Sequence, residues 1–331
     1  MRIFKYRTFN DNNLKSLKEN YIWLADKASL NDPCEGFFTR KKLSNDLQGL
    51  NFISKLIQGS AQFNTLEENL DDVIAMVAKQ GIFSASKSPF IQPLWSLYAN
   101  SHQGFCIEYD IDELIAKHKT YYNYFEVQYL IQPQDISFSN LNLNFKDETS
   151  ENKLFQKIIG TKHIDWQNEQ EVRVISHQVG QNFHRHGAIK AIYFGLKSSL
   201  SDRNNILKLL ANRDIKFNQI VQDTNSYNLF AKPMENPFLN NEKENIIPLS
   251  LIDECAIYEK GVKDKYRKFI PFLYKAQDIM SKDPDCEVIH TIDFSIKSTL
   301  ENPIIYVNFK EKNCDFYSSQ KLFTINELQK N

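Results

Sequence analysis

Residues 162–175, Lys-His-Ile-Asp-Trp-Gln-Asn-Glu-Gln-Glu-Val-Arg-Val-Ile, decide how the chain is predicted to fold. Side chains alternate between the two faces of a β-strand, so Glu169, Glu171 and Arg173 are expected on one face. The valines that alternate with them are expected on the other face, in a hydrophobic core. Two carboxylates and a guanidinium on one strand face form either a solvated, salt-bridged surface or a functional site. Trp166 lies where a helix is expected to lead into this strand.

The composition is that of a globular protein with a sizeable core. A chain of 331 residues can form one large domain or two ordinary ones. Hydrophobic residues make up 42% of it and aromatic residues 13%. The net charge of −1 predicts no overall attraction to nucleic acid or membrane, although a local basic patch remains possible. No apolar run reaches the length of a membrane span, so no membrane partner is expected.

The cysteines and the first residues indicate a reducing compartment. The five cysteines are odd in number and scattered, and no Cys-x-x-Cys pair occurs, which argues against a disulfide framework and a structural zinc site. The opening residues, Met-Arg-Ile-Phe-Lys-Tyr-Arg, lack the apolar region of a signal peptide. We therefore expect a cytoplasmic protein.

The order of helix and strand patterns predicts an α+β fold. A domain with a split, mixed sheet and flanking helices is expected over residues 1–232, and a smaller α+β domain over 233–331, because a Pro- and Asn-rich stretch begins at about 232. In the first domain, strands are expected at 2–9, 21–25, 82–86, 105–109, 121–130, 188–194 and 217–222, and helices at 11–20, 40–58, 66–80, 93–98, 151–165 and 201–212. In the second, helices are expected at 250–260 and 262–281, and strands at 287–295 and 303–310. The helix over 151–165 would place Lys162 on a solvated face.

Three predicted strands carry residues suited to binding and cleaving a dinucleotide. Arg7 lies on the first, Ser84 and Ser86 on a later one, and Glu169 and Glu171 on a third. A guanidinium can bind phosphate oxygens through two parallel hydrogen bonds. Serine hydroxyls can hold a ribose or a backbone group, and a carboxylate can stabilise a developing oxocarbenium ion. Together these groups meet the requirements for breaking the nicotinamide–ribose bond of NAD.

This order resembles the Arg, Ser-x-Ser, Glu-x-Glu pattern of the ADP-ribosyltransferases. The resemblance implies that Arg7 braces NAD, that Ser84 and Ser86 support the cleft, that Glu171 is catalytic and that Glu169 helps to accept the target. The chain departs from the usual pattern in having Ser-Ala-Ser instead of Ser-Thr-Ser, and in spacings of about eighty residues, which imply insertions. The implied partners are NAD and a macromolecular acceptor, either nucleic acid or protein.

A second set of motifs resembles the bacterial domain-of-unknown-function family DUF2971 over about residues 1–230. The motifs are Lys5-Tyr6-Arg7, Asn31-Asp32-Pro33 with Glu35, Trp95-x-x-Tyr98 with His102 and Gly104, Trp166 with Glu169, Glu171 and Arg173, and Ile192-Tyr-Phe-Gly195. The family is widespread in bacteria and suspected of a role in phage defence, and its name brings no chemistry. Residues 235–331 show no such resemblance.

Aromatic residues of these motifs could complete an NAD pocket. Trp95, Tyr98 and His102 follow helical spacing and could stack on a nicotinamide or adenine ring, and Tyr6 lies beside Arg7. The alternative for Trp95 and Tyr98 is a helix stripe that faces the core.

Three functions remain open from the sequence. The first is an NAD-dependent ADP-ribosyltransferase-like enzyme, acting as a bacterial toxin or an anti-phage effector. The second is a non-catalytic recognition module for nucleic acid or a phage protein, in which Glu171 and Arg173 form a structural ion pair. The third is a metal-dependent hydrolase built on His177, His184 and His186, although no carboxylate or cysteine stands beside them at ligand spacing.

Overall fold

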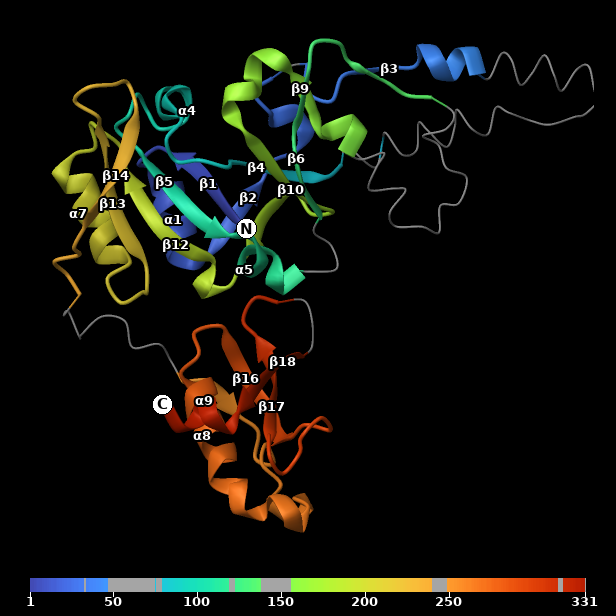
Figure 1. Cartoon of the computed structure of the whole chain (residues 1–331), viewed down its shortest axis with the longest axis vertical. Helices are drawn as coiled ribbons and strands as arrows, with labels where there is room; N and C mark the ends of the chain where they lie inside the picture. Colours follow the sequence, from blue (N-terminus) through green and yellow to red (C-terminus); the bar gives the residue numbers. More distant parts are fainter. Residues whose placement is uncertain are drawn as a thin grey trace, which may run out of the picture.

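The fold is α+β, as the sequence predicts, and its centre is one large mixed sheet. The computed structural model describes residues 1–32, 34–46, 75, 79–118, 123–137, 156–239, 249–314 and 318–330. The large sheet has the order β14 (Leu229–Met234), β13 (Lys216–Gln222), β12 (Ile189–Phe194), β5 (Phe105–Asp110), β1 (Arg2–Arg7), β4 (Gly81–Ser86), β10 (Glu171–Ser176) and β6 (Asn123–Glu126) (Figure 1). Neighbouring strands are antiparallel except β12 and β13, which are parallel.

Helices cover both faces of this sheet. The face with Phe83, Val172 and Val174 packs in one core against α1 (Asp11–Glu19), α5 (Ile111–Ile115), α7 (Leu200–Leu209) and β2 (Tyr21–Leu24). The opposite face packs Phe4 and Tyr6 against α4 (Gln92–Leu97). The core position expected for the two valines of β10 is therefore confirmed.

Local signals explain where two of these helices begin. The Asn10 side chain accepts a hydrogen bond from the Asn13 amide at 2.8 Å and so caps α1. The Ser199 side chain accepts one from the Asp202 amide at 3.0 Å and caps α7, the helix between the parallel strands. The start predicted from the sequence, residue 201, is one residue later than the observed start at Leu200.

Three small strand pairs and several short 3₁₀ helices surround the sheet. The pairs are β2 with β11 (Gly180–Phe183), β3 (Phe38–Thr39) with β8 (Gln134–Asp135), and β7 (Gln128–Leu130) with β9 (Thr161–His163). The 3₁₀ helices are η1 (Lys27–Ser29), η2 (Ala116–His118), η4 (Ile164–Glu169) and η5 (His186–Ala188). The helix predicted over 151–165 is wrong in its second half, which forms β9 and η4. Most of the helices predicted at 40–58 and 66–80 lie outside the described residues.

The C-terminal part has its own sheet and its own core. Its elements are β15 (Leu251–Ile252), η6 (Glu259–Gly261), η7 (Asp264–Phe269), α8 (Ile270–Ser281), β16 (Cys286–Phe294), β17 (Ile304–Glu311), β18 (Ser319–Thr324) and α9 (Ile325–Lys330). Figure 1 shows them in orange and red, apart from the large sheet. The α-helix predicted at 250–260 is wrong, since β15, turns and the start of η6 occupy that stretch. In the described parts of the chain, no helix is both long and apolar enough to cross a membrane.

Candidate functional site

The large sheet is split between β1 and β4, and a cavity opens at the split. The two strands share a single register pair, Phe4 with Ser86, whereas β1 pairs with β5 along its whole length. Beyond that pair an isolated bridge joins β4 to Ala25 instead. The resulting cavity has a volume of about 290 Å³, near the lower end of the range for ligand pockets. The residues lining it are Phe4, Lys5, Tyr6, Arg7, Trp23, Ala25, Ser29, Leu30, Asn31, Glu35, Ile82, Ser84, Ala85, Ser86, Leu94, Tyr98, Lys162, Glu169 and Glu171.

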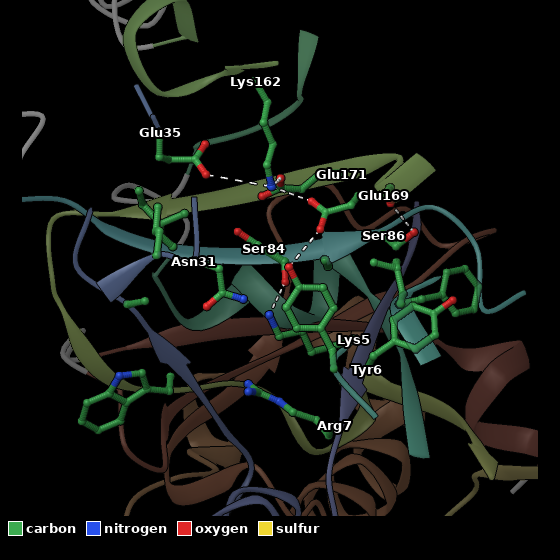
Figure 2. A pocket seen from close by; sticks show the side chains of 18 of the residues that line it. Lys5, Tyr6, Arg7, Asn31, Glu35, Ser84, Ser86, Lys162, Glu169 and Glu171 are labelled. Carbon is green, nitrogen blue, oxygen red and sulfur yellow. Dashed lines mark hydrogen bonds and ion pairs between the residues drawn. The ribbon is translucent and has the colours of Figure 1, made fainter. Parts of the chain in front are cut away.

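Four charged side chains, Glu35, Lys162, Glu169 and Glu171, form one end of the cavity. Together with the fully buried Arg173, which does not line the cavity, they make up what we call the ion-pair network. Arg173 Nε donates to Glu171 Oε1 at 2.8 Å, and a second guanidinium nitrogen bonds Glu35. Lys162 Nζ lies 2.6 Å from a Glu169 oxygen and 3.3 Å from a Glu171 oxygen (Figure 2). All five side chains are buried, so the network is no solvated outer face, and Lys162 is not on a solvated helix.

The network fixes the charge of Glu171. Burial alone would raise the pKa of this carboxyl, but Arg173, Lys162 and a hydrogen bond with Ser84 together lower it to about 2. For Glu35 the balance is the opposite, and burial holds its pKa above the ordinary value in spite of Arg173. Glu171 is therefore a permanent anion at neutral pH, suited to stabilising positive charge and too weak a base to remove protons.

Glu169 reaches the cavity from a different element than the alternation predicts. It ends η4, and Gln170, with φ of 46°, turns the chain before β10 begins at Glu171. This left-handed residue breaks the period of two, so the prediction of Glu169 on the strand is wrong. The Glu169 carboxylate is still linked to that of Glu171, because Lys162 donates hydrogen bonds to both. It also accepts a hydrogen bond from the Tyr98 hydroxyl at 2.9 Å.

The two serines of β4 lie opposite β10, where they support the corner between η4 and β10. Ser84 is in register with Arg173 and lines the cavity beside Glu171, and Ser86 is in register with Glu171. The Ser86 hydroxyl donates to the main-chain carbonyl of Glu169 at 2.7 Å. This bond fixes the position of the carbonyl just before the left-handed turn.

The opposite end of the cavity is cationic, and it contains Arg7 and Lys5. Within the described chain, the Arg7 side chain makes no hydrogen bond or ion pair, although its main chain pairs with Phe105 of β5. The Lys5 amine donates to the main-chain carbonyl of Ser84 and lies 5.0 Å from the centre of the Phe83 ring. Burial, aided by Arg7, lowers the pKa of Lys5 to about 7. Sequence reasoning missed Lys5 as a site residue, although its spacing of two from Arg7 could have revealed it.

Two of the four predicted aromatic and histidine residues line the cavity. Tyr6 and Tyr98 do so, as Figure 2 shows for Tyr6. Trp95 is fully buried beneath Tyr6, with ring centres 5.1 Å apart, and belongs to the core stripe that was the alternative. The His102 ring stacks against Trp95, with ring centres 6.3 Å apart, and neither residue lines the cavity.

The three histidines do not converge. His184 is buried and packs edge-on against Tyr109, and burial lowers its pKa to about 3. His186 lies at the start of η5, and His177 contacts Gln80 at 3.2 Å. Among the residues with described positions, no group of three His, Cys, Asp or Glu side chains could hold a metal ion. Within these described residues, the three histidines therefore give the hydrolase alternative no support.

Comparison with known families supports one of the two resemblances. Residues 94–174 match the family model described as "Protein of unknown function (DUF2971)". The resemblance to DUF2971 is thus confirmed for this segment, which includes η4, most of β10 and the ion-pair network apart from Glu35. Since β1 and β4 precede the matched segment, the cationic end of the cavity lies outside it. No curated protein and no solved structure matches the chain.

Proposed function

We propose that the cavity binds NAD and that the protein is an ADP-ribosyltransferase-like enzyme. The observation that carries this proposal is that Arg7, Ser84 and Glu171, from the successive strands β1, β4 and β10, line one cavity at a split in the sheet. These are the three groups in which the sequence resembles the ADP-ribosyltransferases. A cavity of about 290 Å³ is too small for a whole dinucleotide. We therefore propose that it encloses the reacting nicotinamide ribose while the adenosine extends outward.

The proposed reaction breaks the bond between nicotinamide and the ribose carbon. The bonding electrons leave with nicotinamide, and the ribose becomes oxocarbenium-like until an acceptor oxygen or nitrogen forms the new bond and loses its proton. The permanent negative charge of Glu171 stabilises this cation. Arg7 binds the diphosphate, and Tyr6 and Tyr98 contribute aromatic surface beside the ring.

The acceptor is proposed to be a macromolecule, nucleic acid or protein, modified in the cytoplasm by a bacterial toxin or anti-phage effector. The free thiols of Cys34, Cys106, Cys255, Cys286 and Cys314 support the proposal of a reducing cytoplasm. The defence role rests on the resemblance to DUF2971 alone.

A specific observation also supports the second candidate, a non-catalytic recognition module. Both oxygens of Glu171 accept hydrogen bonds from Arg173, and one also contacts Lys162. Such complete hydrogen bonding of the Glu171 carboxylate is expected for a structural ion pair. The presence of the cavity beside it favours the enzyme.

Substitution Glu171→Gln separates the two candidates. If Glu171 is catalytic, nicotinamide release from labelled NAD, measured with cell extract present, falls on the order of a hundred- to a thousandfold. The lost charge-assisted bonds lower the free energy of unfolding by about 1.5–3 kcal/mol, and the fold persists because Glu35 still pairs with Arg173.

Glu126→Gln is the matched control, because this exposed residue of β6 pairs only with exposed Lys87 among the described residues. It is expected to leave both activity and melting unchanged. A folded Glu171→Gln protein with undiminished activity contradicts catalysis. A wild-type protein that leaves NAD intact with extract present favours the recognition module.

A further inference from the structure

The cationic end of the cavity has more positive charge than its surroundings neutralise. Glu169 and Glu171, on η4 and β10, are the acids that face Lys5, and both are bonded to Lys162. The other groups facing Lys5 are Arg7 on its own strand and the Cys106 thiol on β5, whose pKa is raised by burial. Neither Lys5 nor Arg7 therefore has an acid of its own among the described residues.

The hydrogen bonding of Lys5 is also incomplete. An ammonium group has three donors, and the described chain offers it one acceptor, the Ser84 carbonyl. On the β4 side its other neighbour is the Phe83 ring, which attracts a cation without accepting a conventional hydrogen bond. The remaining donors can reach a ligand in the cavity, which Lys5 lines next to Arg7 (Figure 2).

We propose that Lys5 and Arg7, which both line the cationic end of the cavity, together form a diphosphate subsite. The subsite adds Lys5 to the diphosphate-binding residue Arg7 of the proposed function. Only the choice of an ADP-ribosyl ligand rests on that proposed function. Because a bound anion favours the charged amine, affinity is highest below about pH 7, where Lys5 is protonated, and falls above it. Burial also lowers the pKa of Arg7, but a guanidinium stays protonated over this pH range, so Arg7 accounts for the binding that persists.

The test is calorimetric titration of the full chain with ADP-ribose at about pH 6 and about pH 8.5, since both phosphates of this ligand stay ionised over that interval. If the neutral amine does not bind, the affinity falls on the order of tenfold or more between the two conditions, in proportion to the protonated fraction of Lys5. Adenosine, which has no phosphate, is expected to show no such change.

Two variants assign the effect to Lys5. Lys5→Arg keeps a charge at both pH values, so the affinity for ADP-ribose is expected to lose most of its pH dependence. Lys5→Met is expected to bind weakly at both values. Thermal melting of each variant shows whether the fold is retained, and competitive acetylation of the wild-type protein across the same pH range reports the titration of Lys5 directly.

The outcomes distinguish this subsite from the proposed function. Pronounced pH dependence in a protein that never cleaves NAD supports the subsite and rejects the enzyme. Cleavage of NAD that requires Glu171, together with ADP-ribose binding that is equal in wild type and Lys5→Met, rejects the subsite and keeps the enzyme. Absence of ADP-ribose binding at about pH 6 also overturns the subsite.

Discussion

The two glutamates of the cavity have different partners and therefore different capacities. Glu171 is bonded to two cations, whereas Glu169 shares Lys162 and also accepts from the Tyr98 hydroxyl. Burial and the neighbouring Glu169 raise the pKa of Tyr98 to about 12, so the phenol keeps its proton at neutral pH. Glu169 thereby orients a neutral donor and an ammonium at the cavity wall, while Glu171 supplies the fixed negative charge.

Arg7→Lys is predicted to weaken NAD binding even though the charge is kept, because an ammonium cannot offer two parallel bonds to a diphosphate. The expected loss, on the order of tenfold, corresponds to about one charge-assisted hydrogen bond. Calorimetric titration with NAD measures it. Arg2→Lys, on the same strand but exposed and paired with Asp110, is the control and should bind as wild type does. Equal affinities for the Arg7 variant and wild type would rule out the proposed role.

Strand periodicity located most of the elements that carry the site. Alternation places Val172 and Val174 in the core, and the strands of Arg7 and of the serine pair are correct within about two residues. The signal fails between residues 160 and 170, because β9 is only three residues long and η4 has no apolar period. The sequence pattern consequently predicts a solvated helix at Lys162, whereas tertiary packing buries this side chain in the ion-pair network.

The junction between η4 and β10 depends on one backbone conformation. Gln170 is exposed and has a left-handed backbone, φ 46° and ψ 49°, which a β-branched residue tolerates poorly. Gln170→Val is predicted to lower the free energy of unfolding by about 1–2 kcal/mol and to shift Glu169 relative to Glu171. Gln170→Gly is predicted to be neutral or stabilising, since glycine adopts this conformation without strain.

Chemical denaturation of the two variants measures the difference. Gln167→Val, at an exposed position of η4 without a positive φ, controls for introducing valine on this surface. If both valine variants lose the same stability, backbone strain at Gln170 is not the cause.

The N-terminal and C-terminal parts of the described chain have separate hydrophobic cores, and polar contacts join the two parts. Lys117 of η2, almost fully buried, lies 3.1 Å from an Asp285 oxygen and donates to the Lys312 carbonyl at 2.8 Å. Arg185 contacts Glu311 at 2.8 Å. Such ion pairs between parts far apart in the chain have no local sequence signal, so the sequence indicates two domains but not how they meet. The Pro- and Asn-rich stretch begins inside β14, which runs to Met234.

Residues just beyond β14 still belong to the first core. The Asn236 side chain donates to the Leu207 carbonyl at 2.8 Å, and Phe238 packs against the core beneath the large sheet. A fragment of residues 1–239 is therefore predicted to fold alone. This fragment lacks Asp285 and Glu311, the partners of Lys117 and Arg185. Removal of the C-terminal part also exposes both cations to water, so we expect no unpaired charge to remain buried. Fragment 1–234 is predicted to be less stable by about 1–4 kcal/mol, because it lacks one buried hydrogen bond and one aromatic contact.

Thermal melting followed by circular dichroism compares the two fragments with the full chain, and NAD assays with cell extract compare their activities. All residues that line the cavity lie between Phe4 and Glu171. Under the proposed function, a folded 1–239 fragment is therefore predicted to release nicotinamide still. If the C-terminal part selects the acceptor, the fragment no longer labels the target of the full chain. An insoluble 1–239 fragment would show that the polar contact joins two halves of one folding unit. Equal melting of both fragments would instead show that the segment after β14 contributes nothing to the first core.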